Sequence, residues 1–103
     1  HLQRCACEAL QNLSSNLYNR IRIVEHGGAA LVVQAMMRHL YSLSIQQCGC
    51  SALAALAASP ELRADILQAG GGLAISHSLR KFDHDMGFCV HASQALQVLG
   101  FAN

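Results

Sequence analysis

Charged side chains are scarce in this sequence. Asp, Glu, Lys and Arg make up 13% of its 103 residues, and the formal net charge is only +1. Globular domains usually carry about 25% charged residues. So small a net charge gives no global electrostatic reason for binding to nucleic acid or to an anionic membrane surface. We therefore expect neither nucleic acid nor membrane among the partners of this chain.

Long apolar runs, strand patterns and catalytic motifs are missing as well. Although 52% of the residues are hydrophobic, no apolar run approaches the roughly 18 residues that a membrane-spanning helix needs. No run of alternating β-branched residues lies between turn signals, which argues against a sheet. The sequence has no Gly-x-Ser-x-Gly elbow, no phosphate-binding loop with its Lys and Ser/Thr, and no paired carboxylates. We expect a non-enzymatic protein without a cofactor.

The sequence contains three similar copies of one 12-residue segment. Residues 2–13, 45–56 and 88–99 align without a gap at a spacing of 43 residues. Each copy has Ala-Leu at its eighth and ninth positions and Leu at its twelfth. Apolar residues in the first copy follow the i, i+3, i+4, i+7 spacing of an amphipathic helix. A period of about 40–47 residues is typical of helical solenoids, so these segments predict stacked helical repeats.

Comparison of residues 2–42 with 45–85 shows what the copies share. Ten of the 41 aligned positions are identical, and most of these are apolar residues, glycines or cysteines. Gln3 and Arg20 are the polar exceptions, matched by Gln46 and Arg63. The shared positions are therefore mostly packing positions, as a stack of similar units requires.

The apolar periodicity and the turn signals predict seven helices. Helices are expected over residues 2–14, 19–26, 29–40, 45–58, 60–69, 73–82 and 86–101. Two glycine clusters, 27–28 and 70–72, mark sharp corners. Ser42 or Ser44 can cap the following helix, and Ser59-Pro60 combines an N-cap with proline at the first helical position.

The expected unit is a short helix, a glycine corner, a medium helix, a polar loop and a long helix. Residues 1–16 would be the last helix of a preceding repeat, and residues 17–58 and 59–103 two full repeats. The start at His1 and the end after a helix-like segment lead us to expect a piece of a longer chain. Such a slice would have apolar ends, so we also expect end-to-end self-association.

The repeated unit resembles the armadillo repeat over essentially the whole chain. The resemblance is carried by Ile23-Val-Glu-His-Gly-Gly28, by Ile66-Leu-Gln-Ala-Gly-Gly71 and by the pattern Gln-x-Cys-x-Cys-x-Ala-Leu-x-x-Leu. HEAT repeats share much of the apolar pattern but have less of the Gly-Gly corner. The resemblance implies an all-α, right-handed α-solenoid of three-helix repeats. It also implies a concave groove, lined by the long third helices, that binds a protein or an extended peptide.

The same resemblance implies which residues face the groove. The expected partner-binding residues form a polar stripe on the long helices: Arg4, Glu8, Asn12, Gln47, Ser51 and Gln94. In armadillo proteins an Asn at the position of Asn12 commonly binds the peptide backbone, but Ala55 and Val98 depart from this pattern. Importin-like members carry Trp four residues earlier, and this chain has no Trp. Recognition of nuclear signals in the importin manner is therefore disfavoured.

The five cysteines do not suggest a disulfide framework. Cys5 and Cys7 lie two residues apart in a helical pattern, as do Cys48 and Cys50, so the members of each pair point apart. Equivalent positions in successive repeats would stack roughly 8–10 Å apart, too far for a disulfide. We expect the cysteines to fill core positions in a reducing compartment, which implies an intracellular protein of the cytoplasm or nucleus.

One stretch gathers residue types that can bind metal: Asp83, His84, Asp85, Cys89 and His91. A zinc site needs three or four converging ligands. Cys89 and His91 lie two apart on an expected helix and diverge, and His91 replaces Cys5 and Cys48 of the other copies, which indicates a packing substitution. We therefore expect no metal site.

Two alternatives to an interaction scaffold remain open at this stage. The repeats can serve as a structural spacer inside a larger multidomain protein, which can also carry an enzyme. A metal or redox site is the less favoured alternative. It would be built from the cysteines and histidines at equivalent positions of successive repeats.

Overall fold

The computed structural model describes residues 17–100, and their regular structure is helical. The elements in order are α2 (Leu17–Glu25), α3 (Gly28–Arg38), α4 (Leu43–Leu56), the short 3-10 helix η1 (Pro60–Leu62), α5 (Arg63–Gln68), α6 (Gly71–Lys81) and α7 (Met86–Leu99). No strand occurs within this range. The predicted all-α class is confirmed for these residues, and the helices predicted within the range are present with ends shifted by only a few residues. The helix predicted over residues 60–69 is divided into the 3-10 helix η1 and α5. The helix predicted over residues 2–14 lies outside the described residues.

The helices of the second half recur at a constant shift from those of the first. Helices α3 and α6 each have 11 residues, and α4 and α7 each have 14. The shift from Gly28 to Gly71 and from Leu43 to Met86 is 43 residues in both cases, and η1 with α5 stands in the same relation to α2. We refer to residues 17–56 as unit 1 and residues 60–99 as unit 2.

The glycine corners have the same geometry in both units. Gly27 and Gly70 adopt positive φ angles of 80° and 94°, the left-handed region that favours glycine. A Cβ on the next glycine would lie 2.7 Å from the carbonyl oxygen of Ile23 at Gly28 and 3.0 Å from that of Ile66 at Gly71. Both glycines of each pair are thus required by the turn and by the close backbone approach. The predicted corners are confirmed.

Side-chain caps begin the two long helices at equivalent positions. The Ser42 hydroxyl accepts a hydrogen bond from the Ile45 backbone N–H at 3.4 Å. One period later, the Asp85 carboxylate accepts from the Phe88 N–H at 2.9 Å. Of the two serines proposed from the sequence, Ser42 is therefore the cap, and Ser44 lies inside α4.

The predicted cap at Ser59 is only half right. Ser59 holds the N-cap position before Pro60, but its hydroxyl makes no capping hydrogen bond. It accepts instead from Nε of Arg20 in unit 1, at 2.6 Å. Arg63, the counterpart of Arg20, donates from its Nε to the Ala57 carbonyl oxygen at the end of α4. The matched arginines thus bind the connection between the units.

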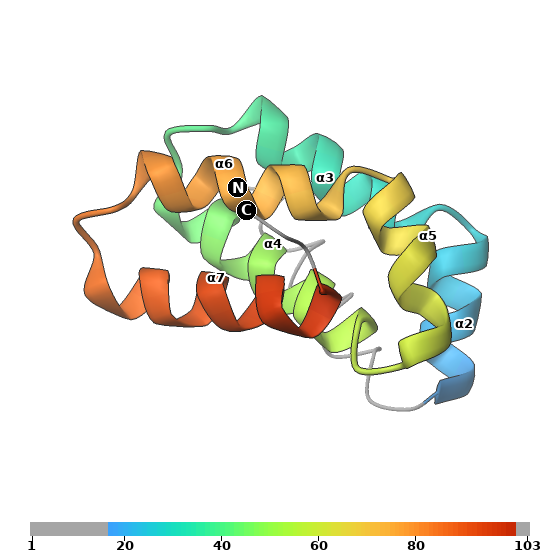
Figure 1. The fold of residues 1–103 in the computed structure, drawn as a ribbon. Coiled ribbons are helices and arrows are strands. Elements are labelled where there is room, and N and C mark those ends of the chain that lie inside the picture. The colour runs from blue at the N-terminus through green and yellow to red at the C-terminus, as the bar shows by residue number, and fades with distance from the viewer. Residues whose placement is uncertain (1–16, 101–103) are drawn as a thin grey trace.

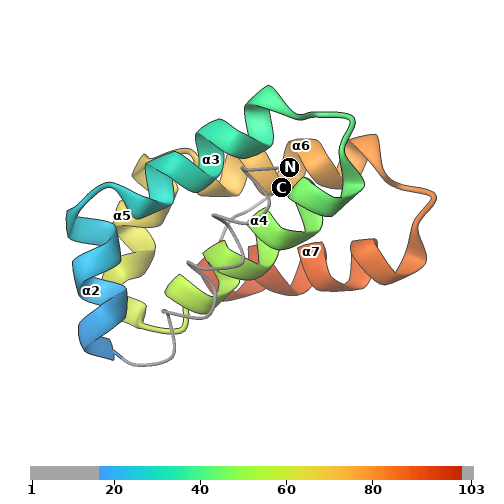
Figure 2. The ribbon, with the colours of Figure 1, turned by 180° about the vertical axis from the view of Figure 1, so that it is seen from behind.

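The two units form two stacked layers of three helices. Helix α6 packs against α3 and α7 against α4, and both pairs lie side by side in Figures 1 and 2. The short helices α2 and α5 lie together at one end of the layers. No helix in the described part of the chain is long and apolar enough to cross a membrane. The right-handed superhelix stays a prediction, since it describes an array longer than two layers.

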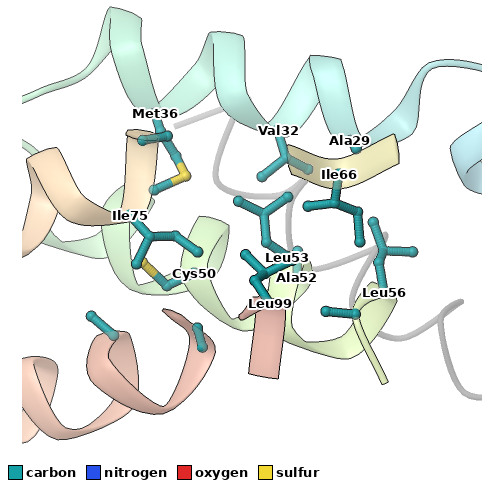
Figure 3. Packing of buried hydrophobic residues seen from close by; sticks show 14 of the residues in the cluster. Ala29, Val32, Met36, Cys50, Ala52, Leu53, Leu56, Ile66, Ile75 and Leu99 are labelled. Atoms are coloured by element: carbon teal, nitrogen blue, oxygen red, sulfur yellow. The ribbon is translucent and has the colours of Figure 1, made fainter. Parts of the chain in front are cut away.

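One apolar core runs through both layers (Figure 3). Its largest fully buried apolar side chains come from five helices: Val32, Met36, Leu53, Leu56, Ile66, Ile75 and Phe88. The aligned leucines Leu53 and Leu96 are both buried in it, as the 43-residue period predicts. The third aligned leucine, Leu10, lies outside the described residues.

Gln46 is the largest of the polar side chains that are buried in the described residues. Its amide nitrogen donates to the carbonyl oxygens of Met36 and His39, both at 2.8 Å, near the end of α3. Its amide oxygen accepts from the hydroxyl of Ser78 on α6. Gln46 therefore closes the corner between α3 and α4 and also connects unit 1 to unit 2.

Candidate functional site

The predicted binding face lies on α4 and α7, which pack side by side across the two units. Ser51 on α4 and Gln94 on α7 are equivalent positions, 43 residues apart. Both helices bury the same stripe toward the core, with Ala52, Leu53 and Leu56 matched by Ala95, Leu96 and Leu99. Burial of that stripe orients Ser51 and Gln94 toward the accessible side of the helix pair.

A hollow of about 180 Å³ opens between these two helices, and we call it the long-helix hollow. It is lined by Cys50, Ser51, Ala54, His91, Gln94, Ala95 and Val98. Buried Cys50 and Ala95 lie deepest, whereas His91 and Gln94 are exposed. The hollow thus combines an apolar floor with polar side chains at its edge.

The structure brings together two of the six residues predicted to bind a partner. Ser51 and Gln94 line the long-helix hollow, while Gln47 is exposed on α4 but is not part of it. The other three predicted residues lie outside the described residues: Arg4, Glu8 and Asn12. Of the three described residues of the expected stripe, Gln47 and Gln94 are exposed and Ser51 is half-buried.

His91 is an exposed polar lining residue that was not among the predicted binding residues. Its replacement of cysteine in the other copies suggested a packing role, but its side chain is exposed and lines the hollow. The packing interpretation is wrong, because this position of α7 faces away from the core. The signal was present in the helical spacing, since His91, Gln94 and Val98 stand at i, i+3 and i+7 and share one face.

Cys50 and His91 line the same hollow. In cysteine-dependent enzymes a Cys thiol and a His imidazole act as nucleophile and base. Burial raises the pKa of the Cys50 thiol from 9.0 to about 12. Reactive cysteines require the opposite shift, toward the thiolate at neutral pH. The thiol therefore acts as part of an apolar floor, in keeping with its place among the core residues in Figure 3.

In the polar corner between α6 and α7, the side chains contact neighbouring residues of the same corner. Asp85 caps α7, and the imidazole of exposed His84 lies 3.3 Å from the Asp83 carboxylate. The Cys89 sulfur lies 3.6 Å from the carbonyl oxygens of both Phe82 and Asp83. Within residues 17–100, no three His, Cys, Asp or Glu side chains come together in a geometry that could hold a metal ion.

Fold and site together define an all-helical protein with a polar-edged hollow between its two long helices. No protein-family model matches the chain, and no curated protein or solved structure matches it either. The resemblance to armadillo repeats is therefore carried by the residues of this sequence alone.

Proposed function

We propose that this chain is a segment of an armadillo-like α-solenoid and a non-enzymatic scaffold that binds a protein or an extended peptide on the face of α4 and α7. Two features support the proposal. The helices recur at the 43-residue period, which is the behaviour of stacked repeats. The second feature, the long-helix hollow, carries the argument, because two residues selected from the sequence line it together.

The chemistry of the long-helix hollow suits an extended peptide. An extended backbone presents N–H and C=O groups that have no partner within the peptide itself. The Ser51 hydroxyl and the Gln94 amide each supply both a donor and an acceptor for such groups. The floor formed by Cys50 and Ala95 suits an apolar side chain of the ligand, because both floor residues are buried and uncharged at neutral pH.

Selection from a random peptide library tests this function. We expect selected peptides to bind the wild-type chain and to lose affinity at least tenfold, about 1.4 kcal/mol, when Ser51→Ala and Gln94→Ala are combined. Gln34→Ala is the matched control, since Gln34 is an exposed glutamine on α3, outside the hollow. Affinities can be measured by fluorescence polarisation, and thermal unfolding monitors the fold. Peptides that bind the double variant as tightly as the wild type would refute a site on this face.

The structural spacer is the second candidate, and exposed apolar side chains favour it. Leu73 on α6 and Met86 at the start of α7 are 68% and 78% exposed. Large apolar side chains at the end of a stack are suited to contact with a further domain. A library that yields no peptide for the long-helix face would support this alternative over the scaffold.

A further inference from the structure

A second hollow, of about 360 Å³, lies where the short helices of the two units meet, and we call it the seam hollow. One wall comes from α2 and α3, and the other from η1 and α5. Buried Ala29 and Leu62 and half-buried Val24 and Ala69 give it apolar walls. It shares no residue with the long-helix hollow, so it is a separate surface.

Two carboxylates line this hollow from opposite units. Glu25 belongs to α2 and Asp65 to α5, and both side chains are exposed. Among the described residues, neither carboxylate has an ion pair or a hydrogen-bonded partner. The arginines of the same two helices donate elsewhere: Arg20 to Ser59, Arg22 to Tyr18 and Arg63 to Ala57. The seam hollow therefore has a negative rim that the described chain does not neutralise.

The acidic rim is not a feature that the two units share. One period earlier, Arg22 takes the place of Asp65, and His26 takes the place of Ala69. These two residues line another hollow, of about 300 Å³, on the corresponding face of unit 1. Among the neighbouring positions, Ile23 is matched by Ile66, whereas Val24 is matched by Leu67. The charge thus differs between equivalent positions that flank the same isoleucine, which points to recognition rather than to a feature that stacking of the units requires.

We propose that the seam hollow binds an arginine side chain presented by a partner protein. The apolar walls contact the methylene stem, and the guanidinium lies between the Glu25 and Asp65 carboxylates. The amide oxygen of Gln68, which also lines the hollow, accepts a further hydrogen bond. This surface goes beyond the proposed peptide site, because it uses the short helices and a different ligand chemistry.

Arginine fits the seam hollow better than the other cations. Its planar guanidinium has five N–H donors and can bind acceptors on two opposite walls at once. It is also less strongly hydrated than an ammonium group, so it loses less hydration free energy when it lies against apolar walls. A calcium ion would need six to eight oxygen ligands. The side chains lining the hollow offer the two carboxylates and one amide oxygen.

Titration of the isotope-labelled 103-residue chain with N-acetyl-arginine amide tests the proposal. We expect saturable chemical-shift changes at the backbone amides of Glu25, Gly27, Asp65 and Ala69. N-acetyl-citrulline amide has nearly the same shape without the charge. We expect it to bind at least about tenfold more weakly, since charge-assisted hydrogen bonds are roughly twice as strong as neutral ones.

Matched variants separate a specific site from general attraction to negative charge. The response should disappear in the double variant Glu25→Gln, Asp65→Asn. It should persist in Glu61→Gln, Asp83→Asn, which removes the same charge from exposed positions outside the hollow. Equal responses to arginine and citrulline, equal loss in both double variants, or shifts centred on other helices would each overturn the proposal.

Discussion

Gln46 is a polar residue that the apolar core accommodates through hydrogen bonds. Its side chain is 1% exposed, and it bonds two carbonyl oxygens of α3 and the hydroxyl of Ser78. A polar group is tolerated in an apolar core when its own donor and acceptor atoms are hydrogen-bonded. In the sequence, the identity of Gln3 and Gln46 marked this position as shared but gave no reason for it.

Replacement of Gln46 should therefore be costly. Gln46→Leu removes its hydrogen bonds to the Met36 and His39 carbonyls and to the Ser78 hydroxyl, although the His39 carbonyl keeps its bond from the Ser42 N–H. We expect a loss of about 3 kcal/mol in the free energy of unfolding. Ser78→Ala should cost about 1 kcal/mol alone and almost nothing in the Gln46→Leu background, because the bond is already gone. Urea unfolding of the four proteins measures both effects. Fully additive losses would show that the two side chains are not coupled.

The buried thiol of Cys50 predicts a pH effect on stability. Its pKa is 9.0 in the unfolded chain and about 12 in the folded protein. Between these values the unfolded chain releases the proton while the folded chain keeps it, so the free energy of unfolding falls as pH rises. The stability difference between wild type and Cys50→Ala should be constant below pH 9 and should shrink above it, by at most about 1.4 kcal/mol per pH unit. Urea unfolding of both proteins at about pH 8 and about pH 10.5 checks this; a difference that does not change would contradict it.

At the scale of elements, the two caps differ in strength. The Asp85 carboxylate bonds Phe88 N–H at 2.9 Å, and the Ser42 hydroxyl bonds Ile45 N–H at 3.4 Å. We expect Asp85→Ala to lower the free energy of unfolding by about 1–2 kcal/mol and Ser42→Ala by less. Ser44→Ala, inside the same first turn as Ser42, should stay within about 0.5 kcal/mol. Thermal unfolding ranks the three variants, and a larger effect at Ser44 would mean that the cap is misassigned.

Helix α4 has opposite faces that respond differently to truncation. Leu53 is fully buried, and Gln47 is exposed six residues earlier. Leu53→Ala should cost about 2–5 kcal/mol because it leaves a cavity in the shared core. Gln47→Ala should cost less than about 0.5 kcal/mol. Denaturant unfolding measures both, and equal costs would mean that the two faces are reversed.

At the scale of the whole molecule, the two outer faces of the stack differ from the seam between the units. Leu31 on α3 is 59% exposed, whereas its counterpart Ala74 on α6 is 2% exposed. Met86 is exposed, whereas its counterpart Leu43 is partly buried against the core. The same repeat positions are thus covered at the seam and open at the ends. Open apolar faces favour association with a matching surface.

We therefore keep the expectation that the chain associates end to end at high concentration. Sedimentation velocity over a range of concentrations should show a rising apparent mass. Leu73→Lys with Met86→Lys should weaken this association, because a lysine charge would have to be desolvated in the contact. Gln34→Lys adds one like charge at an exposed polar position and should have little effect. A chain that stays monomeric at all concentrations would rule out association through these faces.

Much of the fold could be predicted from local sequence, because the signals were local. The apolar spacing located the helices, and the glycine pairs located the corners, since only glycine tolerates the φ angles of Gly27 and Gly70. The period placed Leu53 and Leu96 in one core. The hydrogen bond from Arg20 to Ser59 could not be predicted, because it joins residues 39 positions apart and replaces a local cap.

The sequence by itself determined that the chain is helical and that its pattern repeats every 43 residues. Side-chain periodicity and turn chemistry act over a few residues, so they can be recognised without the tertiary structure. It also indicated Ser51 and Gln94, since helical spacing fixes which residues share a face. Only the tertiary structure decided which of those positions meet. The packing of α7 on α4 put His91 and Cys50 into one hollow, and the meeting of α2 and α5 placed Glu25 opposite Asp65. Such contacts depend on how whole helices pack against each other, and no short stretch of residues specifies that packing.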